Sequence, residues 1–317
     1  MGRGPHIVGV DIGGTKVAVA RVSFSMHVQA LRQEPTVTAS PAACFAALCE
    51  QIEAVIAAGP VVAIGVGTAS RVDFAHGRIV ESTHLPWRDF PLRDELQARF
   101  GLPVVVDNDA TVACIAEHRF GAGRGVNDML MLTVGTGVGG GIIAGGRVYR
   151  GATGAAGEFG HMVIDLDGPP CGGNCPGSGC LEAFVSGSVL DDRARDLAER
   201  NPAGAIARAG EDVDGALLTG LARNGDPAAA AVFGEIGRLL GVGITNLVNI
   251  FNPQLVVVGG SVSDAGELLL RPVREVVAAY GLRPQREDVR IVAARFRGNA
   301  GVVGAAALAY TELVDRC

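Results

Sequence analysis

The stretch that decides the fold is Ile7-Val8-Gly9-Val10-Asp11-Ile12-Gly13-Gly14-Thr15-Lys16, followed by the apolar run Val17 to Val22. An apolar run, a glycine–threonine turn and another apolar run predict a strand, a tight turn and an antiparallel return strand. The pattern recurs from Met129 to Ala144, around the turn Gly135-Thr136-Gly137-Val138-Gly139-Gly140-Gly141. This indicates a weak internal duplication, and we expect an α/β protein with two similar domains that face a cleft.

Both glycine turns are candidate phosphate sites. Gly135-x-Gly137-x-x-Gly140 also fits the dinucleotide fingerprint, which requires a helix after the glycines. Here Ile142-Ile143-Ala144 predicts a strand, so we expect a hairpin whose backbone amides face a phosphate. Asp11, at the end of the first strand, is a candidate to hold hydrated Mg²⁺ near the phosphates. A plain tight hairpin and an ordinary turn aspartate are the alternatives.

Caps and hydrophobic spacing predict several further elements. Ser40-Pro41 begins a helix in which apolar residues recur at helical spacing as far as Ile56. Gly259-Gly260 follows a buried strand, where it would let a nucleotide approach the backbone or form a strand-to-helix turn. The other expected helices span 92–100, 109–118, 228–251 and 300–314, and the other expected strands span 61–66, 104–106 and 255–258.

Length and composition restrict the class of protein. At 317 residues the chain exceeds one typical domain and can bury a large core. A net charge of −6 without a basic run argues against a nucleic-acid surface. We expect no apolar stretch of membrane-spanning length and a cytoplasmic location. Seven cysteines, three of them clustered, fit free thiols and a metal better than a disulfide framework.

Four potential metal ligands lie in one glycine-rich stretch: His161, Cys171, Cys175 and Cys180. One imidazole and three thiolates are typical of zinc, and four protein ligands indicate a closed structural site. If one nitrogen of His161 binds the metal, the other is fixed as a hydrogen-bonding group that can face a sugar hydroxyl, beside Glu158 and Glu182. The alternatives are reduced free thiols and glutamates that face solvent or cap a helix.

Asp109 is the candidate general base. It follows a predicted strand within Asp107-Asn108-Asp109, at the expected start of a helix. Phosphoryl transfer to a sugar needs an acceptor for the hydroxyl proton, and we expect the helix dipole to keep Asp109 ionised. Asn108 can donate and accept, which suits a sugar hydroxyl. The alternative is that the two aspartates only cap the helix.

Taken together, these segments resemble the ROK family (repressor, open reading frame, kinase), part of the actin-like ATPase and hexokinase superfamily, over nearly the whole chain. The resemblance implies a two-domain, ribonuclease H-like α/β fold. A small domain of residues 1–118 would be joined by a C-terminal helix at 300–317, and a large domain of residues 119–299 would carry a zinc-binding loop at 158–182. The segments that carry the resemblance are 11–16, 107–110, 135–141, 157–161 and 171–182.

The resemblance implies ATP-dependent phosphorylation of a hexose at its 6-hydroxyl, with glucose as the first expectation, by a homodimer or homotetramer. Asp109 would be the base, and the zinc ligands would be the histidine and three cysteines above. The implied sugar contacts are Asn108, Glu158, His161 and Glu182. The implied contacts to MgATP are Asp11, Gly13, Gly14, Thr15, Lys16, Thr136, Gly137, Gly259 and Gly260.

The chain departs from the family pattern in two places. The family spaces its first two cysteines by one residue and this chain by three, which makes Cys171 the least secure ligand. Thr83-His84-Leu85-Pro86-Trp87 stands where the family has Pro-Asn-Leu-Pro-Gly-Trp, which leaves Trp87 to stack on a sugar or to pack in the core.

Three alternatives to an ATP-dependent glucose kinase concern the sugar, the phosphoryl donor and a regulatory role. The substrate could be N-acetylmannosamine, N-acetylglucosamine, mannose or fructose, and the donor could be polyphosphate. Some family members are sugar-responsive repressors with an added N-terminal helix-turn-helix. Because the first strand begins at Ile7 and the chain is acidic, we expect a kinase that binds no DNA.

Overall fold

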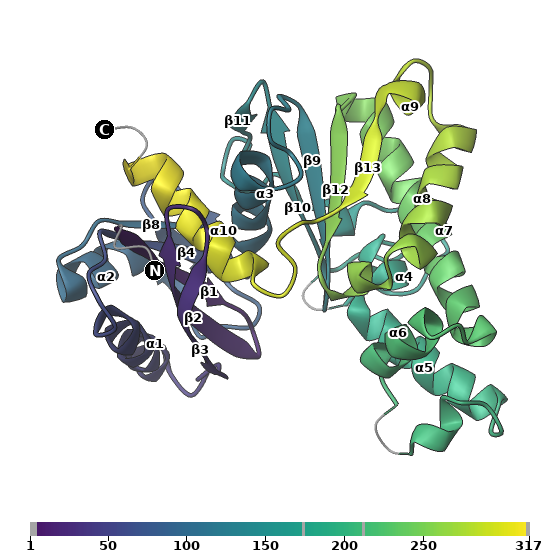
Figure 1. Ribbon diagram of the computed structural model, residues 1–317, viewed down its shortest axis with the longest axis horizontal. Coiled ribbons are helices and arrows are strands. Elements are labelled where there is room, and N and C mark those ends of the chain that lie inside the picture. Colours follow the sequence, from purple (N-terminus) through teal and green to yellow (C-terminus); the bar gives the residue numbers. More distant parts are fainter. Residues whose placement is uncertain (1–4, 173–174, 211–212, 315–317) are drawn as a thin grey trace. The chain divides into compact units, whose positions relative to one another are not determined.

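Two five-stranded sheets with matching strand order organise the chain (Figure 1). The structure, a computed structural model, describes residues 5–172, 175–210 and 213–314. The chain divides into unit 1 (residues 1–125, 141–157 and 298–317) and unit 2 (residues 126–140 and 158–297). The α/β fold expected from the sequence is confirmed, and the domain boundaries at 118 and 299 stay a prediction.

The sheet of unit 1 has the order β3-β2-β1-β4-β8. β1 pairs with β2 as an antiparallel hairpin and with β4 in parallel, and β4 in turn runs parallel to β8. The strands are β1 (His6–Ile12), β2 (Lys16–Ser23), β3 (Val28–Pro35), β4 (Ala63–Thr68) and β8 (Val104–Asn108). A second, three-stranded sheet contains β5 (Arg71–Asp73), β6 (Arg78–Glu81) and β7 (Arg88–Phe90).

Helices cover both faces of this sheet. Because side chains alternate along a strand, Val8 and Val10 share one face, where they pack in the core with α1 and α2. Gly9 and Gly65 meet the other face, where an added Cβ would collide with backbone carbonyls of α10. The two glycines therefore permit a close approach of this helix. The helices are α1 (Pro41–Ile56), α2 (Leu92–Phe100), α3 (Asp109–Phe120) and α10 (Ala300–Ala309).

The predicted start of α1 is confirmed in detail. The Ser40 side chain accepts a hydrogen bond from the amide of Ala43 at 3.1 Å, and Pro41 occupies the first helical position. The helix ends at Ile56, the last of the apolar residues that recur at helical spacing. α10 is shorter than predicted, because a π-helical turn, Tyr310–Val314, replaces its expected last residues.

The other five-stranded sheet repeats the order as β11-β10-β9-β12-β13. β9 runs parallel to β12, and β12 runs parallel to β13. β10 follows β9 directly, so the prediction of a hairpin in place of a Rossmann turn is confirmed. The strands are β9 (Met129–Val134), β10 (Val138–Ala144), β11 (Arg147–Val148), β12 (Leu255–Gly259) and β13 (Arg290–Ala293).

The helices of unit 2 pack around the long helix α7. α7 contacts α8, and Gly237 and Gly241 allow this contact because an added Cβ would meet α8 closely at either position. The helices are α4 (Glu182–Val185), α5 (Gly187–Arg200), α6 (Gly215–Arg223), α7 (Pro227–Phe251), α8 (Glu267–Tyr280) and α9 (Gln285–Asp288). Short 3-10 turns span Phe159–His161, Ala207–Ala209 and Ser261–Ala265.

α7 corrects one expectation. By length and composition this helix could span a membrane, although the sequence was expected to hold no such stretch. Half of its most apolar window is buried within the protein, as is common for the central helix of a folded domain, so the match is weak evidence for a membrane span.

Candidate functional site

In unit 1, acidic and amide side chains gather where parallel strands end. The sheet register places Asp11 of β1 and Asp107 of β8 opposite the same residue, Gly67 of β4. Asn108 ends β8, and Asp109 begins α3 immediately after it. Because the carboxyl ends of β1, β4 and β8 share one edge, this edge brings together residues about a hundred positions apart in sequence.

Hydrogen bonds orient Asp109 at the start of α3. The side-chain amide of Asn108 donates to Oδ1 of Asp109 at 2.9 Å, and the amide of Ala110 donates to the same oxygen at 2.8 Å. The cap of the helix is Asn108, whose Oδ1 accepts from Ala110 and Thr111. The interpretation that the two aspartates serve only as caps is therefore wrong, since Asn108 fills that role.

Burial controls the protonation of the two acids at this edge. It raises the pKa of Asp109, although hydrogen bonds from Ala110 and Asn108 oppose the shift. Burial, and then the negative charge of Asp109, raise the pKa of Asp11 to about 6, whereas Lys16 lowers it. The expectation that the helix start keeps Asp109 ionised stays a prediction, and burial of the carboxylate works against it.

A buried ion pair beside Asn108 was missed by the sequence analysis. Nε of Arg150 donates to Oδ2 of Asp107 at 2.8 Å, and the two side chains are 17% and 3% exposed. The other oxygen, Oδ1, accepts the backbone amide of Asn108 at 2.9 Å. Arg150 also lies over the ring of Phe74, 3.6 Å from its centroid. The partners are 43 positions apart, so no local pattern marks the pair.

The first glycine turn joins β1 to β2. The amide of Gly13 donates to the carbonyl of Lys16 at 3.0 Å, and the hydroxyl of Thr36 donates to the carbonyl of Gly13 at 2.7 Å. Thr15 and Lys16 are exposed. An added Cβ at Gly14 would lie 2.7 Å from the Cβ of His84, so the 82–87 loop lies against this turn.

Trp87 is a core residue. It is 2% exposed, stacks on Phe90 with centroids 5.0 Å apart, and donates from Nε1 to the carbonyl of Pro41 at 3.1 Å. Of the two roles considered for Trp87, packing is therefore the one that the structure supports.

The second glycine turn, in unit 2, is hydrogen-bonded to Glu182, a residue that is predicted to bind the sugar. The amide of Gly135 donates to the carbonyl of Gly137 at 2.9 Å and closes the turn. Oε2 of Glu182 accepts the amide of Val138 at 2.6 Å, and an added Cβ at Gly137 would lie 2.6 Å from the same oxygen. The carbonyl of Thr136 accepts from Ser188 at 3.0 Å.

The end of β12 requires glycine. Gly260 has a φ of 85°, which favours glycine, and an added Cβ there would collide with the carbonyl of Val134 at the end of β9. An added Cβ at Gly259 would lie 2.9 Å from the Cε of Met131. The backbones at the ends of β9 and β12 thus lie close together, because Gly260 has no side chain to separate them.

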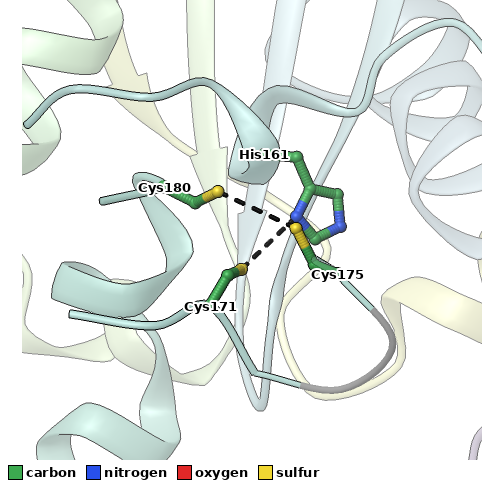
Figure 2. A group of neighbouring side chains, drawn as sticks. All are labelled: His161, Cys171, Cys175 and Cys180. Atoms are coloured by element: carbon green, nitrogen blue, oxygen red, sulfur yellow. Dashed lines mark hydrogen bonds between the residues drawn. The ribbon is translucent and has the colours of Figure 1, made fainter. Parts of the chain in front are cut away.

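The four predicted metal ligands meet in one cluster (Figure 2). Their ligand atoms all lie within 4.8 Å of one another. Nδ1 of His161 is 3.5 Å from Sγ of Cys171, and Sγ of Cys175 is 3.9 Å from Sγ of Cys180. Cys171 therefore lies with the other three residues of the cluster despite the altered spacing. One nitrogen and three sulfurs fit a tetrahedral zinc ion.

Backbone pairing folds the cluster. The amide of Ile164 donates to the carbonyl of Gly179 at 2.8 Å, and the amide of Leu181 donates to that of Met162 at 2.9 Å. The amide of Cys171 donates to the carbonyl of Gly177 at 2.9 Å. These bonds place segments that are distant in sequence side by side. Gly173 and Asn174, between the first two cysteines, lie outside the described residues.

Thiol acidity differs within the cluster. Burial raises the pKa of Cys171 to about 12 and also raises that of Cys180. A hydrogen bond from the Gly177 amide lowers the pKa of Cys175. Nε2 of His161 points away from the sulfurs and lies 3.9 Å from a carboxylate oxygen of Glu158. The two imidazole nitrogens thus have the separate environments expected of them.

The ROK family profile matches residues 7–312. The chain belongs to the ROK family. A glucokinase of Streptomyces coelicolor is 36% identical over 309 residues, which cover 95% of this chain and 96% of that enzyme. The crystal structure of a ROK family glucokinase from Streptomyces griseus, in complex with glucose and AMPPNP, is 37% identical with a TM-score of 0.87, and the match covers 96% of this chain and 99% of that one.

ROK relatives also include regulators. A xylose repressor of Caldicellulosiruptor bescii is 32% identical over 258 residues, which cover 80% of this chain and 64% of the repressor. Membership of the ROK family therefore fixes the fold and leaves two classes of activity, kinase and regulator, to be separated by the residues of the site.

Proposed function

We propose that this chain is a glucokinase, which transfers the γ-phosphoryl group of ATP to the 6-hydroxyl of glucose. The observation that carries the proposal is the carboxylate of Asp109, held by hydrogen bonds at the start of α3. A repressor needs no positioned base, whereas a sugar kinase does. The similarity to glucokinases over nearly the full length of both chains supports the same reaction.

Asp109 acts as the general base. Its bonded oxygen is Oδ1, and the other oxygen, Oδ2, accepts the 6-hydroxyl proton while O6 attacks the γ-phosphorus. The O6–P bond forms as the bond from that phosphorus to the bridging oxygen of ADP breaks. The raised pKa of Asp109 makes its carboxylate a stronger base, and it must be ionised before each turnover.

The sugar is recognised by groups that can exchange hydrogen bonds with hydroxyls. The first of these groups is Asn108, whose amide already orients Asp109. The others are Glu158, His161 and Glu182. His161 presents Nε2 to a hydroxyl while Nδ1 faces the cysteines.

ATP is held by the glycine turns and by the strand ends beside them. The proposed phosphate contacts are Gly13, Gly14, Thr15, Lys16, Thr136 and Gly137. Gly259 and Gly260 border the adenosine, since they offer backbone without side chains. Asp11 would hold the hydrated Mg²⁺, whose positive charge would neutralise the phosphates.

We also assign zinc to the cluster of His161, Cys171, Cys175 and Cys180, because one imidazole and three thiolates match its preferred donors. A four-ligand site is structural: it braces the loop that carries His161 and leads into Glu182. Zinc has no part in the phosphoryl transfer.

The test is an ADP-release assay with MgATP across glucose, mannose, fructose, N-acetylglucosamine and N-acetylmannosamine. We expect kcat/KM to be highest for glucose. A higher value for an acetylated sugar would retain the kinase and overturn the substrate. Repeating the assay with polyphosphate, by following glucose 6-phosphate, tests the donor.

A sugar-responsive regulator is the second candidate, because xylose repressors are among the relatives. Sugar binding measured by calorimetry, without phosphorylation of any sugar in the panel by either donor, would favour it. Rapid turnover of glucose would exclude a purely regulatory role.

A further inference from the structure

We propose that Arg150 is a positioning residue for the general base, and this inference rests on the proposed function. A continuous series of bonds connects the two residues. Arg150 holds the carboxylate of Asp107, which accepts the backbone amide of Asn108, and the side chain of Asn108 donates to Asp109. Every donor–acceptor distance in this series is 2.8 or 2.9 Å.

Asp107 depends on its partner for its charge. Burial raises the pKa of Asp107, and the charge of Arg150 together with its hydrogen bond opposes that shift. Without Arg150, the carboxyl would take up a proton or draw water into the site, and either change would weaken its bond to the Asn108 amide. Asn108, which caps α3 and orients Asp109, would then lose the hydrogen bond that holds its backbone amide.

Arg150 is itself held firmly, as a positioning group must be. Its guanidinium lies on the ring of Phe74, and Nη2 is 3.9 Å from a carboxylate oxygen of Glu312. Its own carbonyl accepts the amide of Ala156 at 3.1 Å, which closes the loop after it. A planar guanidinium can stack on the ring and bond the carboxylate at once, whereas an ammonium cannot match both.

The first test compares Arg150→Met with a matched control, Arg21→Met. Arg21 is a partly buried arginine of the same sheet, bonded to His6 at the opposite end of β1 from Asp11. We expect Arg150→Met to lower kcat by about 10- to 100-fold, while KM for glucose and for ATP changes by less than roughly threefold. Arg21→Met should leave kcat close to wild type, although either variant can unfold at a lower temperature.

Rescue and coupling separate positioning from general damage. Arg150→Lys should recover part of the lost kcat, because it keeps the charge without the fork. The losses in Arg150→Met and Asp107→Asn should be non-additive, with the double variant no slower than Arg150→Met alone. Additive losses, or a loss that appears only in KM, would overturn the inference.

Hydrogen exchange makes the test independent of activity. We expect faster exchange at the amides of Asn108, Ala110 and Thr111 in Arg150→Met, with α1 unchanged, and no such effect in Arg21→Met. Unchanged exchange at these amides would overturn the inference even if kcat fell. If the wild type does not phosphorylate glucose and exchange still rises at this junction, the proposed function fails while the positioning role stands.

Discussion

The two five-stranded sheets share a strand order but differ in the residues at the ends of their central strands. In unit 1, β1 carries Asp11 and β8 ends at Asn108, directly before Asp109. In unit 2, β9 ends before the Gly135 turn and β12 ends at Gly259. Both sheets carry a glycine turn, but the strand ends of unit 1 add carboxylates, whereas β12 of unit 2 ends in glycine. Carboxylates suit proton transfer, and backbone amides suit anions.

The two units also differ in what braces them. The sheet of unit 1 relies on glycines that let α10 approach its backbone, whereas a loop of unit 2 is organised around a four-ligand cluster. Packing contributes in proportion to buried surface, and a bound metal contributes its binding free energy.

Removal of the metal should have the largest effect, and only in unit 2. If the cluster binds zinc as proposed, Cys180→Ala should lose the metal, and with it roughly 10 kcal/mol of binding free energy. The measurements are metal content per chain and hydrogen exchange in α4 and α1, of which only α4 should exchange faster. Cys49→Ala, a buried cysteine of α1, is the control that should keep its metal. Equal metal content in the two variants would show that the cluster does not bind zinc.

Loss of the base should abolish turnover without loss of sugar binding. We expect Asp109→Asn to lower kcat by about 10² to 10⁴-fold, because the proton acceptor is gone. Calorimetry should show glucose affinity close to wild type.

The matched control for the base is Asp226→Asn, at the start of α7 in unit 2. Its carboxylate accepts from the amides of Ala228 and Ala229, which an asparagine can also cap, so kcat should be unchanged. Substantial activity in Asp109→Asn would instead place the base elsewhere.

A methyl group at a glycine under α10 should destabilise unit 1. The Cβ of Gly65→Ala would collide with the carbonyl of Ala305, so the helix must move, at a cost of about 1–3 kcal/mol. Chemical denaturation measures the free energy of unfolding. Gly234→Ala, in the interior of α7 with open space around it, should instead stabilise by about 0.5–1 kcal/mol. Equal effects would contradict the close approach of α10.

Asp11 should make stability depend on pH. Because its folded pKa is raised from 3.8 to about 6, its charged form costs folding free energy that grows as pH rises between these values. We expect Asp11→Asn to raise the free energy of unfolding by up to about 3 kcal/mol above pH 6, with little effect below pH 4, because each pKa unit corresponds to about 1.4 kcal/mol. Thermal unfolding across this range measures it.

The opposite sign is expected at Asp73, whose pKa is lowered first by a hydrogen bond from His76. Asp73→Asn should therefore lower stability at neutral pH and have less effect in acid. If both variants respond alike to pH, the environment assigned to Asp11 is incorrect.

Local patterns in the sequence were enough to predict several structural elements of the candidate site. The glycine turns, the helix that begins at Ser40 and the cysteine cluster all depend on residues close in sequence, where spacing and residue type restrict the backbone strongly. Helix ends were less exact, as at α10, because its last turn winds as a π-helix.

What the sequence by itself determined is membership of the ROK family and the candidate groups for chemistry: a candidate base, two candidate phosphate turns and four potential metal ligands. Only the tertiary structure decided how burial sets the pKa of Asp109, that Asn108 is the cap, and that Arg150 supports Asp107. The physical reason is that desolvation and long-range ion pairs depend on which distant segments pack together. That packing comes from the sum of many weak contacts across the sheet and is not written at any one position.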